Sequence, residues 1–572
     1  MSDGSQAALA GGFTWLDWTV VLALFALTHW IGKLSSGKPA TIREFFLGGR
    51  TLPWYAVSAS IIATEISAVT LISLPATVFK TGGDITYLQL GLIGLFLARW
   101  IVALWLIPKY FEQEIYSPYD YMARALGDRA RTITTVLFSI GGVLGQAARV
   151  YLTGIVLQVV LFDEFAAFER ATGVPGLWAA IGAIGVVAIL WTWAGGMATV
   201  IWTDAVLFVI FLLAIVASAF YAVTHVEGGV ATVVELGQQA GKFRFFDFEP
   251  TFAKANTIWA ALIANTLVGV GVFGTDQLMA QRVFCCKSKR EAQKAMLASY
   301  LSMAVAVSVA LLGIALHAYY TQHPLSGSAA ALYAEKSDRI FPIFIVEVLP
   351  AGVRGLIIAG AFAAAISSLD SILAALSQTV MTAFVLRGKV PQTPQAEKRA
   401  LRASKLLVLG FGVLLCVIAA LCEVVQRDAR FKDVLNLALS MPGYTQGAVL
   451  ATFALAYFAG RRIDASGLTY AAPLSVLAVV GIAWHEPWTF VALKLGVTAL
   501  ALAWILGRIV RRPEELAPTL VRSVALALGC ALVLWIPDQG WKVEWPWFAP
   551  SGLAVATLYG YVLAVPRKET RA

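Results

Sequence analysis

The sequence predicts an all-helical integral membrane protein, from its composition, its apolar segments and two interrupted segments. Of its 572 residues, 59% are hydrophobic and 13% are charged, and the mean hydropathy is +0.76. Soluble domains carry about 25% charged residues, so this chain has too little polar surface to face water on all sides. The net charge of +9 fits the basic loops of a membrane protein, and we expect no nucleic-acid partner.

Apolar segments long enough to cross a bilayer as helices follow one another along the chain. We count fifteen, at residues 13–31, 54–77, 87–106, 134–160, 177–194, 199–222, 256–280, 296–320, 355–386, 406–425, 434–459, 467–484, 489–507, 520–536 and 548–565. Asp17 lies inside the first segment and no basic residue precedes it, so we expect a permanent helix there rather than a secretion signal. The intervening loops are short, and we expect no soluble domain.

The basic residues predict an orientation. If the N-terminus is outside, the inward loops hold 28 of the 43 lysines and arginines, Arg282 among them, and the outward loops hold 12. Because basic residues gather in cytoplasmic loops, this bias favours a multi-pass protein of a plasma or bacterial inner membrane, with the N-terminus outside and the C-terminus inside.

Charged residues within the apolar segments indicate function, because each costs about 2.5 to 3.5 kcal/mol at bilayer depth. The cations are Arg99, Arg149 and Lys494, and the acids are Glu65, Asp204, Asp276 and Asp370. Arg99 and Lys494 lie close enough to a segment end for their side chains to reach the membrane surface. Glu65 and Arg149 lie mid-segment, and they either pair with each other or serve a solute.

Two segments read as broken helices. The second contains polar and β-branched residues at 64–67, after Ala63, and the seventh contains three glycines before Asp276. Lipid cannot satisfy the backbone groups that a break frees, so such breaks persist where they line a polar cavity or bind ions. The two segments are five apart, which predicts two inverted repeats of five helices at residues 54–222 and 256–459. Residues 1–53 and 460–572 would then be peripheral.

The ninth segment carries hydroxyls and a carboxylate close together, at Ser367, Ser368, Asp370 and Ser371. Hard oxygen ligands near one helix face suit a hard cation, whereas a face of small residues that only packs is the alternative. A packing face does not need a carboxylate. Asp204 in the sixth segment offers a second one for the same site.

These motifs together resemble the sodium:solute symporters, a family that includes sodium/glucose-type carriers and bacterial sialic acid and galactose carriers. The resemblance runs roughly from Glu44 to Phe458, and it rests on residues 46–50, 52–54, 63–68, 202–204, 275–277, 281–282 and 367–371. It implies the five-plus-five inverted-repeat (LeuT-like) transporter fold, with about 15 transmembrane helices in this chain. It also implies sodium as the coupled ion.

The resemblance further implies an ion site. The sodium would be bound by backbone carbonyls and hydroxyls, those of Ala63, Ile66, Ala364, Ser367 and Ser368. A second sodium, which some members bind, would contact Asp204, Asp370 and Ser371, although like-charge repulsion could instead keep one of the two carboxylates protonated.

Solute-binding candidates lie on the core segments, at Glu65, Thr70, Gln89, Arg149, Asp276 and Gln277. Arg149 could receive a carboxylate in a bidentate manner if it is not tied to Glu65. Sugars, sugar acids and amino acids all stay open as solutes.

The implied activity is sodium-coupled import of a small polar solute by alternating access, so we expect no enzyme. A proton-coupled permease of the same fold is the closest alternative, since Glu65, Asp204 or Asp370 could carry a proton. A transporter-like sensor is another alternative, although no signalling domain is evident, and we expect no obligate protein partner. Dependence of uptake on sodium or on pH would separate the two transport mechanisms.

Overall fold

A computed structural model describes residues 13–35, 41–66, 68–113, 115, 117–389, 391–426, 440–485, 487–509 and 516–566. Within these ranges the regular elements are helices, and the pairs Leu52–Cys286 and Ile463–Pro566 form isolated bridges.

The first half of the chain contains α1 (Trp15–Ser35), α2 (Ile42–Leu47), α3 (Trp54–Glu65), α4 (Ala68–Phe79), α5 (Phe96–Ile101), α6 (Ile107–Glu112), α7 (Pro118–Leu126), α8 (Asp128–Val160), α9 (Phe162–Thr172), α10 (Gly176–Thr224) and α11 (Gly229–Gln239). The second half contains α12 (Thr266–Val270), α13 (Gln277–Phe284), α14 (Lys289–Ala298), α15 (Ser302–Gln322), α16 (Gly327–Glu335), α17 (Ile340–Glu347), α18 (Val353–Val380), α19 (Pro394–Gln426), α21 (Gly443–Ala459), α22 (Leu468–Ala483), α23 (Pro487–Ile509), α24 (Leu516–Trp535) and α25 (Phe548–Val562).

Wider π-helical turns continue several of these helices, at η2 (Leu90–Leu95), η3 (Val102–Leu106), η4 (Ala260–Asn265), η5 (Gly271–Thr275) and η8 (Met381–Val385). Short 3₁₀ turns lie at η1 (Gly48–Arg50), η6 (Ser299–Leu301), η7 (Ser337–Arg339), η10 (Ile536–Gln539) and η11 (Trp545–Trp547).

Among the described residues, ten helices are long and apolar enough to cross a membrane, and two bent pairs raise the number to as many as twelve. The other three predicted spans coincide with α21, α22 and α25, which have 17, 16 and 15 residues. The predicted segment 434–459 begins outside the described residues. The total of fifteen spans therefore stays a prediction.

Both predicted helix breaks are confirmed. The backbone of Ile66 is extended, with φ −84° and ψ 103°, and the helices on either side of it bend by 53°. Asp276 is extended in the same way, with φ −78° and ψ 129°, and the helix ending at Thr275 bends by 51° relative to α13. Residue 67, part of the first predicted break, lies outside the described residues.

Gly196 divides α10 into two candidate spans, Gly176–Trp193 and Gly196–Thr224. Its φ of 63° and ψ of −161° belong to a region that only glycine enters readily. A Cβ there would lie 2.6 Å from the carbonyl oxygen of Phe45, so backbone from another element approaches closely. With α10 divided, five candidate spans run from the first broken helix to Thr224, and the predicted division into two repeats stays a prediction.

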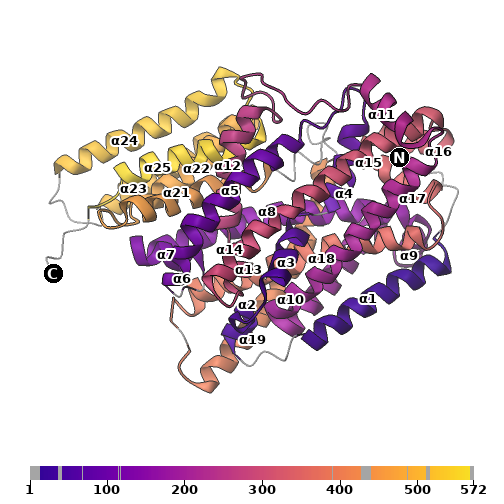
Figure 1. Cartoon of the computed structure of the whole chain (residues 1–572). Coiled ribbons are helices and arrows are strands. Elements are labelled where there is room, and N and C mark those ends of the chain that lie inside the picture. The colour runs from indigo at the N-terminus through magenta and orange to yellow at the C-terminus, as the bar shows by residue number, and fades with distance from the viewer. Residues whose placement is uncertain are drawn as a thin grey trace.

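The helices α10 and α18 pack against each other in the bundle, and α1 packs on both of them. Figure 1 shows α1 in indigo on one side of the bundle and α22 to α25 in yellow on the opposite side. Asp17 of α1 accepts hydrogen bonds from the backbone N–H groups of Gly352 and Gly355, at 2.7 and 2.9 Å. A carboxylate is stabilised at a helix N-terminus, here that of α18, which explains why an acid lies in the first apolar segment.

Large apolar side chains cover the outer faces of the bundle. Phe220 is 68% exposed, Leu406 is 67% exposed and Leu528 is 62% exposed, on three different helices. This outward apolar surface fits lipid and would be costly in water.

Candidate solute and ion sites

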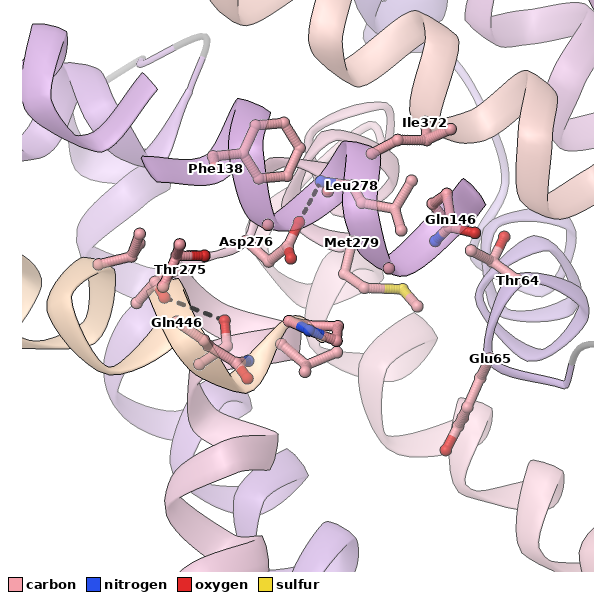
Figure 2. Close-up of a pocket in the computed structure, with 18 of the residues that line it drawn as sticks. Thr64, Glu65, Phe138, Gln146, Thr275, Asp276, Leu278, Met279, Ile372 and Gln446 are labelled. Carbon is pink, nitrogen blue, oxygen red and sulfur yellow. Dashed lines mark hydrogen bonds between the residues drawn. The ribbon is translucent and has the colours of Figure 1, made fainter. Parts of the chain in front are cut away.

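Two adjacent cavities lie where both broken helices meet α8 and α21. Their volumes are about 140 Å³ and about 200 Å³. They share part of their lining, at Glu65, Arg149, Val272, Pro442 and Gln446. Figure 2 shows the smaller cavity, with Glu65 and Thr64 at the end of α3 and Asp276 at the start of α13. The breaks thus place polar groups beside open space, as expected of interrupted membrane helices.

Four of the six predicted solute residues line these cavities. Glu65 and Arg149 line both, Thr70 lines the larger and Asp276 lines the smaller. The other two do not. The Gln89 amide donates to the Asn256 carbonyl oxygen at 2.7 Å, and the Gln277 amide donates to the Gln378 side-chain oxygen at 2.8 Å, with both glutamines fully buried.

The prediction that Arg99 reaches the membrane surface is wrong. This residue is 1% exposed and does not reach the membrane surface, and Glu65 pairs with it rather than with Arg149. Arg99 also donates to the hydroxyls of Ser299 and Ser302 at 3.1 Å each, and its guanidinium lies 4.1 Å from the centre of the Phe273 ring. Position along a segment does not tell which face a residue occupies, and this face packs against the second repeat. Lys494, the other predicted surface cation, is exposed.

Arg149 points into the cavities without a protein partner. No described residue forms a hydrogen bond or an ion pair with its guanidinium, although Glu65 and Asp276 line the same space. The carboxylate of Asp276 instead accepts the backbone N–H of Leu278 at 2.8 Å, which caps α13 (Figure 2). Arg149 is therefore available to an incoming anion.

Three of the five predicted sodium ligands surround one small void. Ala63, Ile66 and Ser367 line a space of about 10 Å³, roughly the size that one water molecule needs, together with the apolar residues Leu207, Phe208, Phe211 and Ala363. The last carbonyls of a helix have no partner within it and carry partial negative charge, so the end of α3 suits a cation. Ala364 and Ser368 lie on α18 next to Ser367, and Ser368 is 1% exposed.

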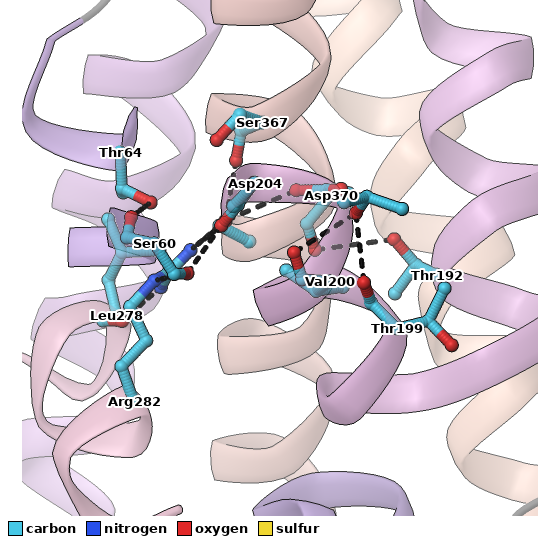
Figure 3. A network of polar contacts seen from close by, with 12 residues as sticks. Ser60, Thr64, Thr192, Thr199, Val200, Asp204, Leu278, Arg282, Ser367 and Asp370 are labelled. Atoms are coloured by element: carbon cyan, nitrogen blue, oxygen red, sulfur yellow. Dashed lines mark hydrogen bonds and ion pairs between the residues drawn. The ribbon is translucent and has the colours of Figure 1, made fainter. Parts of the chain in front are cut away.

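The residues predicted for a second sodium also meet, but around an arginine. The Arg282 guanidinium lies 3.1 Å from an Asp204 oxygen, contacts the Ser371 hydroxyl, and donates to the Ser60 hydroxyl at 2.8 Å. Ser60 donates in turn to Asp204 at 2.6 Å, and Ser367 faces the same carboxylate (Figure 3). We predicted that Arg282 lies in an inward loop, and this was wrong, because its side chain is completely buried.

The charges of this cluster do not balance. Asp204 and Asp370 are both fully buried, and Arg282 supplies one positive charge to the pair. One Asp370 oxygen has no hydrogen-bond partner among the described residues, while the other accepts from Ser371 at 3.1 Å. Two buried carboxylates beside one guanidinium leave room for one more positive charge, a proton or a metal cation.

Comparison with known proteins agrees with this geometry. Residues 45–472 match the family model described as the sodium:solute symporter family. The chain belongs to the sodium:solute symporter family. As a member of that family it is a multi-pass membrane transporter and not an enzyme, it moves small organic solutes, and sodium is the coupling ion.

Individual relatives of this symporter are moderately similar. Sodium-coupled monocarboxylate transporter 2 of Bos taurus is 27% identical over 454 residues, which cover 77% of this chain and 68% of the relative. The human sodium/iodide cotransporter is 24% identical over 556 residues, covering 93% and 77%. The solved outward-open structure of a Na+-coupled sialic acid symporter matches with a TM-score of 0.73 and 22% identity, and covers 97% of this chain and 100% of that one. This match shows that the two symporters share the fold.

Sequence-based reasoning missed the uncharged polar residues of the cavities. Tyr87 and Asn265 line the larger, Gln146 and Thr445 line the smaller, and Gln446 lines both. Each of these residues lies in or beside an apolar segment. The same position within an apolar segment is what identified the charged candidates. A neutral side chain costs less at bilayer depth, so its position is a weaker indication of function.

Proposed function

We propose that this symporter imports a small organic anion together with sodium, and that Arg149 binds the carboxylate of the solute. The observation that carries the proposal is the unpartnered Arg149 guanidinium at both cavities. The neighbouring Glu65 is paired with Arg99, so its charge does not cancel that of Arg149. A guanidinium in a water-poor site binds a carboxylate through two parallel hydrogen bonds.

The names of the relatives support an anionic solute. They describe carriers of monocarboxylates, of iodide and of sialic acid. The cavity volumes of about 140 and 200 Å³ lie below the roughly 300 Å³ at which pockets for drug-sized ligands begin. A monocarboxylate of a few carbon atoms therefore fits this space better than a sugar acid.

The sodium in this proposal lies between the break of the first repeat and α18. Its ligands are the carbonyls of Ala63, Ile66 and Ala364 and the hydroxyls of Ser367 and Ser368. Sodium here would stabilise the extended backbone at Ile66. Glu65, which directly precedes Ile66, lines the solute cavity. Binding of the ion and binding of the solute are thereby coupled through a single helix end.

A second cation completes the cluster around Asp204, Asp370 and Ser371. We propose that Arg282 neutralises Asp204 and that a second sodium neutralises Asp370. The unpaired oxygen of Asp370 supports this assignment. A proton on Asp370 would also balance the charge, and the two possibilities differ in how uptake depends on sodium.

The proposed arrangement in the membrane keeps the N-terminus outside and the C-terminus inside, in a plasma or bacterial inner membrane. Moving Arg282 from the loops to the interior lowers the inward count by one residue and leaves the bias in place. We place the two repeats at residues 54–222 and 256–459, with residues 1–53 and 460–572 peripheral and no obligate protein partner.

The test is uptake into proteoliposomes that contain the purified protein. Short monocarboxylates and the corresponding neutral amides are supplied with an inward sodium gradient. We expect sodium-dependent uptake of the acid and little uptake of the amide, because only the carboxylate satisfies Arg149. Arg149→Gln should lower uptake of the acid by about tenfold or more, since a charge-assisted hydrogen bond contributes about 1.5 to 3 kcal/mol.

Lys494→Gln is the matched control, because it removes a cation from another membrane helix, where the side chain is exposed. It should transport at the wild-type rate. Equal uptake of acid and amide, or an Arg149→Gln variant as active as the control, would contradict the anionic solute while leaving sodium coupling intact.

A further inference from the structure

A third cavity lies among the peripheral helices, away from the ion and solute sites. Its volume is about 470 Å³. The first turns of α8 and α22, the end of α23, the second turn of α24 and the segment after α25 all contribute to it. These ends belong to the side of the bundle that the loop charges predict to face inside. Nothing in the transport mechanism uses this cavity.

Two arginines line the cavity without partners. Arg522 is only 8% exposed, and no described residue forms a hydrogen bond or an ion pair with its guanidinium; the same holds for Arg129, which is exposed. Asp464, two residues before the cavity residue Ser466, accepts the backbone N–H groups of Ser466 and Val565 at 3.0 and 3.2 Å, and Asp128, next to Arg129 in the chain, pairs with Arg131. Two positive charges thus meet at one site, and a largely buried arginine without an anion is costly.

The rest of the lining is divided between hydroxyls and apolar groups. The hydroxyls belong to Ser466, just before α22, and to Thr469 in its first turn. Ile133, Trp504 and Leu563 are apolar lining residues. The Trp504 ring is fixed by the edge of the Tyr470 ring, with centroids 4.8 Å apart. A bound molecule would therefore contact both cations and hydrocarbon groups within one cavity.

The helices around the cavity face lipid. Leu520 and Val521 precede Arg522 on α24 and are 67% and 65% exposed, and Leu506 of α23 is 60% exposed. Arg522 lies near the beginning of the candidate span Thr519–Gln539, which is the depth of the phospholipid headgroups.

We propose that this cavity binds the phosphate of an anionic phospholipid, with Arg129 and Arg522 on the phosphate and the start of an acyl chain on Trp504 and Leu563. Arginine binds phosphate oxygens in a bidentate manner, and basic pockets between helices suit lipid headgroups at the cytoplasmic face. Because Arg129 begins α8 in the core and Arg522 lies on peripheral α24, the lipid fastens the C-terminal helices to the transporter core.

The test compares the thermal stability of purified, delipidated protein with phosphatidylglycerol, with phosphatidylcholine of the same acyl chains, and with inorganic phosphate. Phosphatidylglycerol should raise Tm more than phosphatidylcholine, and inorganic phosphate should have little effect. In the double variant Arg129→Gln/Arg522→Gln, the phosphatidylglycerol concentration that gives half of the rise should increase about tenfold or more, as expected when a phosphate loses charge-assisted hydrogen bonds.

The matched control is Arg461→Gln/Arg462→Gln, which removes two exposed arginines from the same side of the bundle, outside the cavity. It should respond to phosphatidylglycerol as the wild type does. Equal loss in both double variants would show non-specific charge attraction and overturn the site. An equal rise with inorganic phosphate would replace the lipid by a free anion. If Arg129→Gln/Arg522→Gln does not fold, Arg522→Lys replaces it, because lysine keeps the charge but lacks the planar guanidinium. This variant should give a smaller increase in the phosphatidylglycerol concentration needed for half of the rise. An unchanged response to phosphatidylglycerol would overturn the proposal.

Discussion

At the scale of single residues, three arginines of the helix bundle, of which Arg99 and Arg282 are buried and Arg149 is partly exposed, differ in their partners. Arg99 pairs with Glu65 beside the proposed solute cavities, Arg282 pairs with Asp204 near the proposed sodium site, and Arg149 has no hydrogen-bond or ion-pair partner among the described residues. An arginine within a membrane helix normally comes with an acid, so the arginine without one is the group that we propose binds the solute.

Asp370 gives the prediction that belongs to this scale. If a second sodium neutralises it, uptake by the wild type should depend on sodium with a Hill coefficient approaching 2, and Asp370→Asn should lower the coefficient to about 1 by removing the charge that the ion compensates. The measurement is initial uptake against sodium concentration at constant ionic strength.

Asp163→Asn, a change at an exposed acid of α9, serves as the control for loss of a carboxylate. A wild-type coefficient of about 1 would exclude the second sodium. In that case a proton balances Asp370, and the rate should respond to pH instead.

The sequence could show which residues are unusual but not how they pair. Glu65, Asp204, Asp370 and Arg149 stand out because they lie in apolar segments, and all four line cavities or form the buried cluster. The partners of Glu65 and Asp204 come from other segments, 34 and 78 residues away. Packing decides such contacts, and the periodicity of one segment contains no information about which segment packs against it.

At the scale of elements, broken helices place the sites. The extended residues Ile66 and Asp276 end one helix and begin another at bends of 53° and 51°. Each break turns free backbone groups towards a cavity or void instead of towards lipid. Polar residues and glycines within apolar segments predicted both breaks. Irregular backbone is costly in lipid, so it occurs with residues that are unusual in an apolar segment.

The Gly196 division of α10 yields an element-scale prediction. Gly196→Ala should destabilise the protein by about 1 to 3 kcal/mol, since the backbone conformation is strained for alanine and the new Cβ would lie 2.6 Å from the Phe45 carbonyl oxygen. Urea or heat denaturation of the purified protein in detergent measures the change.

Gly182→Ala is the control within the same element, because a Cβ there meets nothing within 4 Å. Alanine in a regular helix is favoured over glycine by about 0.5 to 1 kcal/mol, so this variant should be unchanged or slightly more stable. Similar stabilities for the two variants would show that Gly196 is not a fixed point of the fold.

At the scale of the whole molecule, the sequence predicts the fold class correctly, whereas the number of membrane spans cannot be predicted with the same certainty. Long apolar helices are unambiguous, whereas α21, α22 and α25 have 15 to 17 residues and fall near the limit for crossing a bilayer. The cavity at Arg129 and Arg522 could not be predicted from a sequence motif, because its residues come from five separate elements, α8 among them.

Sodium binding between the end of α3 and α18 should be visible as a change in thermal stability. Purified protein is melted in sodium and in potassium or choline at equal ionic strength, for the wild type, for Ser368→Ala and for Ser377→Ala. Ser377 lies on the same helix but bonds to the Ser404 carbonyl oxygen at 2.9 Å, away from the site, which makes it the control. Ligand that binds only the folded state adds about 2.7 kcal/mol at a hundred times its Kd.

If sodium binds there, we expect a sodium-specific rise in Tm for the wild type and for Ser377→Ala, and a much smaller rise for Ser368→Ala. No sodium-specific rise in the wild type, or an equal rise in Ser368→Ala, would contradict the proposed site.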